Sequence, residues 1–402
     1  MKVIMIPSGF KECLDAEEVA CAMGEGAKRF DPFIKTEMIP MIDGGEGFTK
    51  AIVKIKKGEL IYKDVTGPVG ERINSYYGIF AEGHTRTAVI EMAAVAGLKL
   101  VPRHQRNPLK TTTYGVGELI LDALNVGVDK IIIGCGDSGT SDGGAGMAEA
   151  LGVRFLDDQQ HVVKVRCGEN LVKAATIDLT HLDKRLCDVS IDVACNWKNV
   201  LCGERGVARV FGPQKGASAE QVDRLSMALE HYADLIEKST AMDIRHSPGS
   251  GASGGLGAGL LAFTGAKLHP RFDLIMDFIQ IEEKIASADL VITAEGSLDF
   301  QTPDGKIPCE VARIAKKYGI PVIAITGTIG RGAALNYDRG IDAYVSIIQK
   351  PVTLEKAMFK APQWIEESVE SILRQITIGL KMADQKNAGE RIVSYGKESR
   401  PI

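Results

Sequence analysis

Short apolar runs with the spacing of β-strands alternate along the chain with longer stretches that have the apolar spacing of α-helices. The strand-like runs lie at residues 3–6, 88–91, 130–134, 189–194, 289–293 and 321–325. The clearest helical stretch, residues 15–29, has apolar side chains three or four positions apart, at Ala16, Val19, Ala20, Met23 and Ala27. A second helical stretch covers residues 113–125. This alternation predicts an α/β fold with largely parallel sheets.

Length and local composition predict two domains. The chain has 402 residues, whereas one domain usually has roughly 150. Stretches rich in Gly, Ser and Pro lie at 66–70, 246–259 and 302–306, and the first two are candidate domain boundaries. From about residue 384 the chain is polar with little apolar periodicity, which predicts a frayed tail or an extension that docks a partner.

Charge and composition exclude several function classes. The chain has 48 Lys and Arg against 52 Asp and Glu, and the net charge of −4 creates no field that would attract nucleic acid or an anionic membrane. No apolar run approaches the roughly 18–20 residues of a membrane span, and the N-terminus lacks the long apolar region of a secretory signal. The eight cysteines form no CxxC pair, which is typical of reduced structural thiols. We therefore expect a cytoplasmic protein.

A glycine-rich segment, GASGGLGAG at residues 251–259, leads into the apolar run LLAF. Such a loop can bring backbone N–H groups against a phosphate at the start of a helix. A tight turn with close helix packing is the alternative. The segment is not a Walker A loop, because no Gly-Lys-Ser/Thr follows it.

Two acidic loops follow strand-like runs. Asp43 and Glu46 lie in DGGEG after an apolar run, and they are candidate ligands for magnesium or for a substrate hydroxyl, with an Asx-turn as the alternative for Asp43. The loop at 137–144 carries Asp137, Ser138 and Asp142, which suit a polyhydroxylated or phosphorylated ligand. Simple helix capping is the alternative for Asp142.

A third acidic loop, residues 295–306, combines Ser297, Asp299 and Lys306 directly after the run DLVITA. Carboxylates near a lysine can combine metal binding, proton abstraction and phosphate neutralisation. Lys11 and Lys215 each stand in a loop, where an ordinary solvated lysine is the alternative. Together, Gly-rich loops with Asp, Glu and Lys, and without His or Cys at ligand spacing, favour phosphoryl transfer.

The amino-acid sequences of these segments resemble those of the class I glycerate kinases. The motifs that carry the resemblance occur in the same order along residues 1 to about 380: PSGFKECLDAEEVA, DGGEGF, TAVIEMAAVAGL, TTTYGVGELI, TSDGGAGMAEALGVRFLD, RGVARVFGPQKGA, GASGGLGAGLLAF and DLVITAEGSLDFQT. The resemblance implies phosphorylation of D-glycerate by ATP and magnesium, to 2-phosphoglycerate more often than to 3-phosphoglycerate. It also implies two α/β domains with the site in the cleft between them. One would join residues 1–66 to 289–380, the other would be 67–288, and 381–402 would form a polar tail.

Each candidate residue has an expected role on this hypothesis. We expect Asp142 to accept the proton of the substrate hydroxyl, with Asp43 or Asp299 as the alternative. We expect Lys306 to neutralise the transferring phosphate and Lys11 to be a further catalytic residue. ATP would bind Gly251, Gly254, Gly255, Gly257 and Lys215. The metal ligands would be Asp43, Glu46 and Asp299. The acid substrate would bind Ser8, Asp137, Ser138, Asn196 and Ser297.

The chain departs from the family pattern at five positions. The family usually has Asp at Ser8, Gly at Asp137, Asp at Asn196, Pro at Val200 and Arg at Ser297. These changes redistribute charge in the loops, so a related sugar acid, such as a four-carbon aldonate, remains an alternative substrate. A catalytically silent sensor that binds a hydroxy acid or nucleotide is the alternative from another class, and a homodimer is an open possibility.

Overall fold

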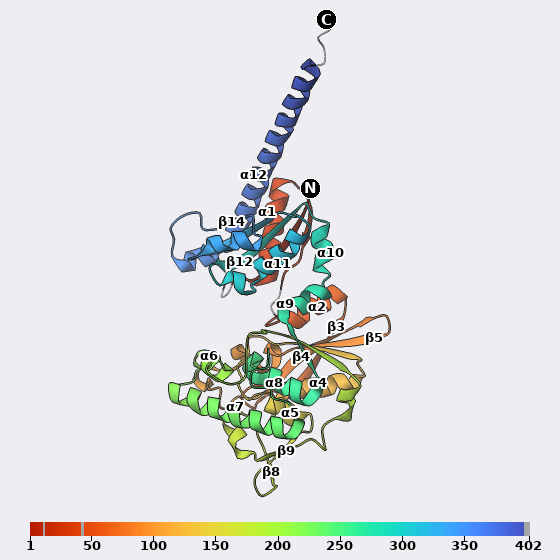
Figure 1. The fold of residues 1–402 in the computed structure, drawn as a ribbon, viewed down its shortest axis with the longest axis vertical. Helices are drawn as coiled ribbons and strands as arrows, with labels where there is room; N and C mark the ends of the chain where they lie inside the picture. The colour runs from red at the N-terminus through yellow and green to blue at the C-terminus, as the bar shows by residue number, and fades with distance from the viewer. Residues whose placement is uncertain (11–12, 42–43, 398–402) are drawn as a thin grey trace. The chain divides into compact units, whose positions relative to one another are not determined.

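The computed structural model describes residues 1–10, 13–41 and 44–397, without the side chains of 304, 384 and 386–397. The chain forms two compact units (Figure 1). The terminal unit joins Met1–Met41 to Gln280–Ile402, and the inserted unit is Ile42–Ile279. Both units have helices packed on sheets with mainly parallel strands, so the predicted α/β fold is confirmed. None of the helices in the described part of the chain has the length and apolar character of a membrane span.

The terminal unit is built on a five-stranded sheet in the order β14-β13-β12-β1-β2, and every pair in it is parallel. Its strands are β1 (Lys2–Pro7), β2 (Lys35–Met38), β12 (Leu290–Leu298), β13 (Val322–Ile329) and β14 (Ala343–Ser346). Its helices are α1 (Ala16–Phe30), α10 (Ile281–Ala286), α11 (Ile307–Lys317) and α12 (Leu354–Lys397), with 3₁₀ turns η6 (Thr302–Asp304) and η7 (Ala333–Arg339).

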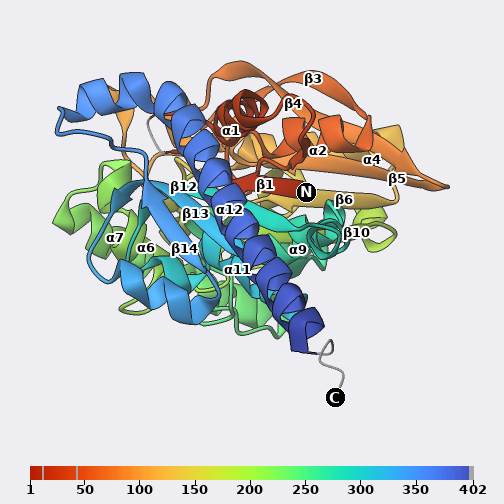
Figure 2. The ribbon, with the colours of Figure 1, turned by 90° about the horizontal axis from the view of Figure 1, so that it is seen from above.

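Helix α1 forms where the sequence predicts it. Asp15 and Glu18 make a reciprocal capping box: the Asp15 carboxylate accepts the Glu18 N–H at 2.8 Å, and the Glu18 carboxylate accepts the Asp15 N–H at 2.9 Å. The predicted apolar face is buried in a core that includes Met23 of α1 and Ile365 and Val369 of α12. Figure 2 shows α12 beside α1, and Figure 1 shows the end of α12 projecting beyond the sheet.

The inserted unit is built on a six-stranded sheet in the order β11-β10-β6-β5-β4-β3. The strands β5, β6, β10 and β11 are parallel, whereas β3, β4 and β5 pair antiparallel. These strands are β3 (Glu59–Thr66), β4 (Arg72–Glu82), β5 (Thr85–Glu91), β6 (Lys130–Gly134), β10 (Ser190–Cys195) and β11 (Lys267–Pro270). A small antiparallel sheet contains β7 (Arg154–Leu156), β8 (Val162–Val163) and β9 (Thr176–Asp178).

Eight α-helices are described in this unit: α2 (Phe48–Lys56), α3 (Ala93–Ala96), α4 (Tyr114–Val126), α5 (Ala145–Ala150), α6 (Val207–Phe211), α7 (Ala219–Thr240), α8 (Ala252–Thr264) and α9 (Arg271–Phe278). Its 3₁₀ turns are η1 (Leu98–Leu100), η2 (Arg103–Gln105), η3 (Gly168–Lys173), η4 (Lys184–Cys187) and η5 (Pro213–Lys215). Apolar residues of β5, β6 and β10 form one core with α4 and α8.

The chain divides between units at residues 41/42 and 279/280, and not after residue 66 and before residue 289 as expected. The physical reason at the first boundary is that β3 pairs with β4 along its whole length, from Glu59 to Thr66, which ties this segment to the inserted sheet. The segment expected as a tail from residue 381 continues α12 as far as Lys397.

The glycine-rich segment begins α8 and packs against the loop that follows β6. Ser253, Gly254 and Gly255 have left-handed backbone angles, with φ of 51°, 72° and 89°. A Cβ built on Gly254 would lie 1.8 Å from the carbonyl oxygen of Thr140, so only glycine fits there.

Replacing Gly254 with Ala should therefore destabilise the fold. We expect a loss of about 3 kcal/mol or more in the free energy of unfolding, because a left-handed Ala and a backbone clash act together. Gly265→Ala is the matched control, since Gly265 has φ of 65° but open space around its missing Cβ. The control should cost about 1 kcal/mol. Urea unfolding of the two variants checks this, and equal losses would contradict the packing argument.

Candidate functional site

The candidate residues of the inserted unit lie where its parallel strands end. In open α/β sheets, ligands bind outside the carboxyl ends of the strands. Here these ends are followed by the loop at 137–144 after β6 and by Asn196 after β10. The loop before α2, residues 44–47, packs over the same edge, because a Cβ on Gly136 would lie 2.6 Å from the Cα of Gly45. The fold therefore brings three of the predicted segments together.

Asp137 and Glu46 meet at this edge. The Asp137 carboxylate accepts the N–H of Glu46 at 3.2 Å, and the Glu46 side chain forms an ion pair with Lys99. Asp137 has a left-handed backbone, with φ of 46°, which explains why glycine is the residue expected at this position. Both side chains are exposed, whereas Asp43, the third acid expected here, lies outside the described residues.

Glu91 is a buried carboxylate bonded to the 44–47 loop that the sequence analysis did not single out. It ends β5, it is 1% exposed, and its carboxylate accepts the N–H of Gly47 at 3.0 Å and that of Thr49 at 3.1 Å. Burial raises the pKa of Glu91 to about 7, although the two N–H donors act in the opposite direction. The signal in the sequence was a single acid at the end of an otherwise apolar strand, TAVIE.

Asp142 is fully buried and anchors two helices. One carboxylate oxygen accepts the N–H and the hydroxyl of Thr113, at 2.7 and 2.8 Å, at the start of α4. The carboxylate also accepts the N–H groups of Gly144 and Gly146, at 3.1 and 3.2 Å, at the start of α5. Burial raises the pKa of Asp142, and these donors oppose the shift. These contacts favour helix capping as the role of Asp142. Its expected role as proton acceptor stays a prediction.

Lys215 is buried against the same loop. Its ammonium group donates to the Ser138 hydroxyl at 2.9 Å, to the Thr140 carbonyl at 2.6 Å and to the Ser141 hydroxyl at 3.4 Å. Burial lowers the pKa of Lys215 to about 7, and the charge of Asp142 opposes this shift. The structure thus joins Lys215 to Ser138, and it gives Lys215 internal partners rather than an open position for ATP.

The remaining predicted residues of the inserted unit also have internal partners. A Cβ on Gly251 would lie 2.1 Å from the Val200 carbonyl oxygen, and one on Gly257 would lie 2.2 Å from that of Gly249. A Cβ on Gly255 would lie 2.7 Å from the Cα of Gly143. These contacts, like that of Gly254, favour close packing of the segment over an approach to phosphate, and the phosphate role stays a prediction. Asn196 is exposed, and its side chain accepts the N–H of Lys198 at 3.1 Å.

A second cluster lies in the terminal unit, beside β1 and β12. Strand β1 pairs in parallel with β2 on one side and with β12 on the other, so the order in which the strands are connected reverses at β1, which makes the gap between β1 and β12 a topological switch point. Ser8 follows β1, and its hydroxyl donates to the Ala294 carbonyl at 3.0 Å. Lys11, also expected here, lies outside the described residues.

Lys306 sits between two carboxylates in this cluster. Its ammonium nitrogen lies 3.6 Å from a carboxylate oxygen of Glu295 and 3.6 Å from one of Asp299. Asp299 also accepts the Ser297 hydroxyl at 3.2 Å and the Gln301 N–H at 2.9 Å. Partial burial raises the pKa of Asp299, but the Gln301 N–H and Lys306 together bring it below its usual value. Asp299 is therefore ionised at neutral pH.

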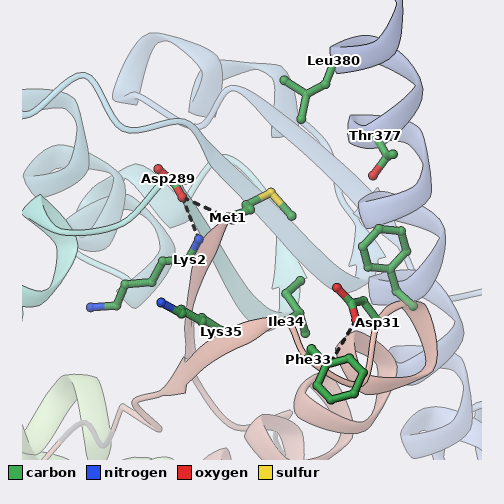
Figure 3. Close-up of a pocket in the computed structure, with 10 residues that line it drawn as sticks. Met1, Lys2, Asp31, Phe33, Ile34, Lys35, Asp289, Thr377 and Leu380 are labelled. Atoms are coloured by element: carbon green, nitrogen blue, oxygen red, sulfur yellow. Dashed lines mark hydrogen bonds and ion pairs between the residues drawn. The ribbon is translucent and has the colours of Figure 1, made fainter.

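No group of three or more His, Cys, Asp or Glu side chains converges as a metal site among the described residues. The terminal unit has a cavity of about 460 Å³ at the amino ends of its strands, opposite the ends that carry the candidate residues (Figure 3). Its lining includes Lys2, Lys35, Asp289 and Leu380, which belong to the amino ends of the strands and to α12. None of the predicted site residues lines this cavity.

The buried state of Lys215 predicts a pH dependence of stability. The pKa is lower in the folded chain than the ordinary 10.5, so the unfolded chain binds more protons above about pH 7. Relative to Lys215→Met, the unmodified protein should gain about 2 kcal/mol between about pH 7.5 and 9, and should show no such gain below pH 7. Urea unfolding across this range measures the difference, with exposed Lys238→Met as the charge control. A flat difference would contradict a buried, easily deprotonated lysine.

The chain is similar to known proteins over nearly its whole length. The sequence profile of the glycerate kinase family matches residues 3–377. A glycerate kinase from Bacillus subtilis is 44% identical over 382 residues, which cover 95% of this chain and 99% of that protein. A glycerate 2-kinase from Escherichia coli is 42% identical over 383 residues, covering 95% of this chain and all of that protein.

A solved crystal structure shows the same fold. It is that of a candidate glycerate kinase 2 from Salmonella typhimurium LT2, which is 43% identical and superposes with a TM-score of 0.80. The match covers 94% of this chain and 99% of that one. Over nearly its whole length, the chain therefore belongs to the glycerate kinase family of enzymes.

Proposed function

We propose that this enzyme transfers the γ-phosphate of ATP to the 2-hydroxyl of D-glycerate, giving 2-phosphoglycerate. The Escherichia coli relative named glycerate 2-kinase supports the acceptor position. The observation that carries the proposal is the Asp299–Lys306 pair at the switch point of a fully parallel sheet, where ligands of α/β folds bind.

Lys306 has the charge and position that a transferring phosphate needs. Phosphoryl transfer depends mainly on positioning and on neutralising the negative charge of the phosphate oxygens. The Lys306 side chain is 27% exposed, so its ammonium group can reach a ligand while Glu295 and Asp299 keep it oriented. We propose that Lys306 binds the γ-phosphate.

Asp299 meets two requirements for the carboxylate that accepts the hydroxyl proton. It is ionised at neutral pH, and its side chain is 19% exposed, whereas Asp142 is fully buried with its oxygens occupied. A carboxylate within hydrogen-bond reach of the hydroxyl takes its proton as the bond to phosphorus forms. In this proposal Asp299, and not Asp142, accepts the proton of the substrate hydroxyl.

Magnesium fits the acidic loop of the inserted unit. Mg²⁺ in kinases is held by one or two carboxylates together with phosphates and water, so it needs no cluster of three acids. The Glu46 side chain is 57% exposed, and the Asp137 carboxylate, from the loop after β6, accepts the Glu46 N–H. When bound, the ion would neutralise phosphate charge. In this proposal Glu46 is a ligand together with Asp43, and Asp299 is not.

The reaction itself is directly testable. Purified enzyme with ATP and magnesium should convert D-glycerate to 2-phosphoglycerate, identified by ³¹P nuclear magnetic resonance. The same assay should include L-glycerate and four-carbon aldonates, because Ser8, Asn196 and Ser297 differ from the family pattern. A preference for an aldonate would contradict D-glycerate as the substrate. Formation of 3-phosphoglycerate would contradict the 2-hydroxyl as the acceptor, and an absence of ADP formation with every acid would contradict the proposed kinase activity.

The roles of the two aspartates can be separated by Asp299→Asn and Asp142→Asn. Asp299→Asn should lower kcat by roughly 100- to 10,000-fold without loss of stability, because it removes the proton acceptor. Asp142→Asn should lower the free energy of unfolding by about 1–3 kcal/mol, since a donor NH₂ would face buried N–H groups, and should change kcat less than about tenfold. Steady-state kinetics and urea unfolding measure both effects. The reverse pattern would return the role to Asp142.

A further inference from the structure

Glu91 is a buried carboxylate that the proposed reaction does not use directly. It is 1% exposed at the end of β5, and the charged groups that face it are Glu46 and Lys50, with the Tyr76 hydroxyl also nearby. A buried carboxylate is costly unless its oxygens are hydrogen-bonded. Its position beneath a candidate site calls for an explanation beyond core packing.

Both Glu91 oxygens bond to the start of α2. One accepts the Gly47 N–H at 3.0 Å and the other accepts the Thr49 N–H at 3.1 Å. These are among the N–H groups that a helix cannot pair internally. The residue before α2 is Gly47, which has no side chain that could cap the helix. Glu91, at the end of β5, supplies the cap instead.

The loop that this cap holds has little stiffness of its own. Gly44, Gly45 and Gly47 surround Glu46, and Gly44 and Gly47 have φ of 80° and 89°. Glycine leaves a backbone more conformational freedom than any other residue, so the direction of Glu46 depends on external contacts. Two carboxylates bind the backbone here: Asp137 accepts the Glu46 N–H, and Glu91 accepts the N–H of the next residue, Gly47.

We propose that Glu91 is a positioning residue for phosphoryl transfer, which fixes the 44–47 loop and thereby aims Glu46 at the bound nucleotide's metal. This inference rests on the proposed function, because the direction of Glu46 matters only if the loop takes part in the reaction. Groups that orient metal ligands usually affect affinity or activity by 10- to 100-fold when altered.

The carboxylate is needed in place of an amide. Two N–H donors face two acceptor oxygens in Glu91, whereas glutamine offers one oxygen and an NH₂ that would meet an N–H. Glu91→Gln therefore keeps the size of the side chain but releases one of the two backbone groups. Glu91→Asp keeps the charge and shortens the reach.

Glu149 provides a matched control in the same unit. One of its carboxylate oxygens accepts the Val165 N–H at 3.0 Å, and the other pairs with Arg166 at 2.7 Å. Glu149→Gln thus removes a similar carboxylate-to-backbone contact at a loop that carries no candidate site residue. A purely structural effect of losing such a contact would appear equally in both variants.

The first measurement is amide hydrogen exchange of the folded full-length variants, which does not depend on activity. In Glu91→Gln, peptides covering residues 44–52 should exchange at least tenfold faster than in the unmodified protein. In Glu149→Gln, faster exchange should be confined to residues near Val165. Unchanged exchange at 44–52 in Glu91→Gln would overturn the proposal. If Glu91→Gln does not fold, Glu91→Asp takes its place with the same criterion.

The second measurement is the magnesium dependence of glycerate phosphorylation at fixed ATP. Glu91→Gln should need about 10- to 100-fold more Mg²⁺ for half-maximal rate, with a smaller change in kcat, and Glu91→Asp should recover part of the loss. Glu149→Gln should match the unmodified enzyme. Equal Mg²⁺ dependence in Glu91→Gln and Glu149→Gln would overturn the proposal even if the loop loosens. If the unmodified protein phosphorylates no acid, the proposed function fails and this role of Glu91 fails with it, while exchange still reports whether Glu91 holds the loop.

Discussion

Buried carboxylates that accept backbone N–H groups hold the loops at the carboxyl ends of the inserted unit's strands. Glu91 fixes the start of α2, and Asp142 fixes the starts of α4 and α5 together. Removing Glu91 would leave two N–H groups without this acceptor, and removing Asp142 would leave three buried ones, and a buried N–H without an acceptor is costly in a protein interior. The exposed acid Glu46 lies next to Gly47 in the loop that Glu91 holds, so its geometry depends on a buried residue of another element.

The terminal unit differs from the inserted unit in its sheet and in the burial of its acids. Its sheet is fully parallel, and the switch between β1 and β12 leaves room for polar groups where the two strands end. Asp299 and Lys306 lie there, only partly buried, and form an ion pair with each other. Groups that stay ionised and accessible are suited to act on a phosphate. The buried acids of the inserted unit are suited to hold the backbone of nearby loops.

Much of the fold was predictable because the apolar periodicity of α1, β6 and the other central elements is strong. The site was only partly predictable. A capping acid and an open acid look alike at a strand-to-helix turn, so sequence alone could not show that Asp142 is enclosed. Likewise, a glycine run that packs on backbone, as at Gly254, has the same composition as one that binds phosphate. Lys215 and Glu91 gain their importance from partners far away in sequence.

A crystal structure of the enzyme with D-glycerate, magnesium and a non-hydrolysable ATP analogue would test the central claim most directly. We predict that the 2-hydroxyl lies within about 3 Å of the Asp299 carboxylate. Lys306 should contact the terminal phosphate, while Asp142 should keep its bonds to Thr113. A complex in which glycerate contacts Asp142, with Asp299 and Lys306 away from both ligands, would contradict it.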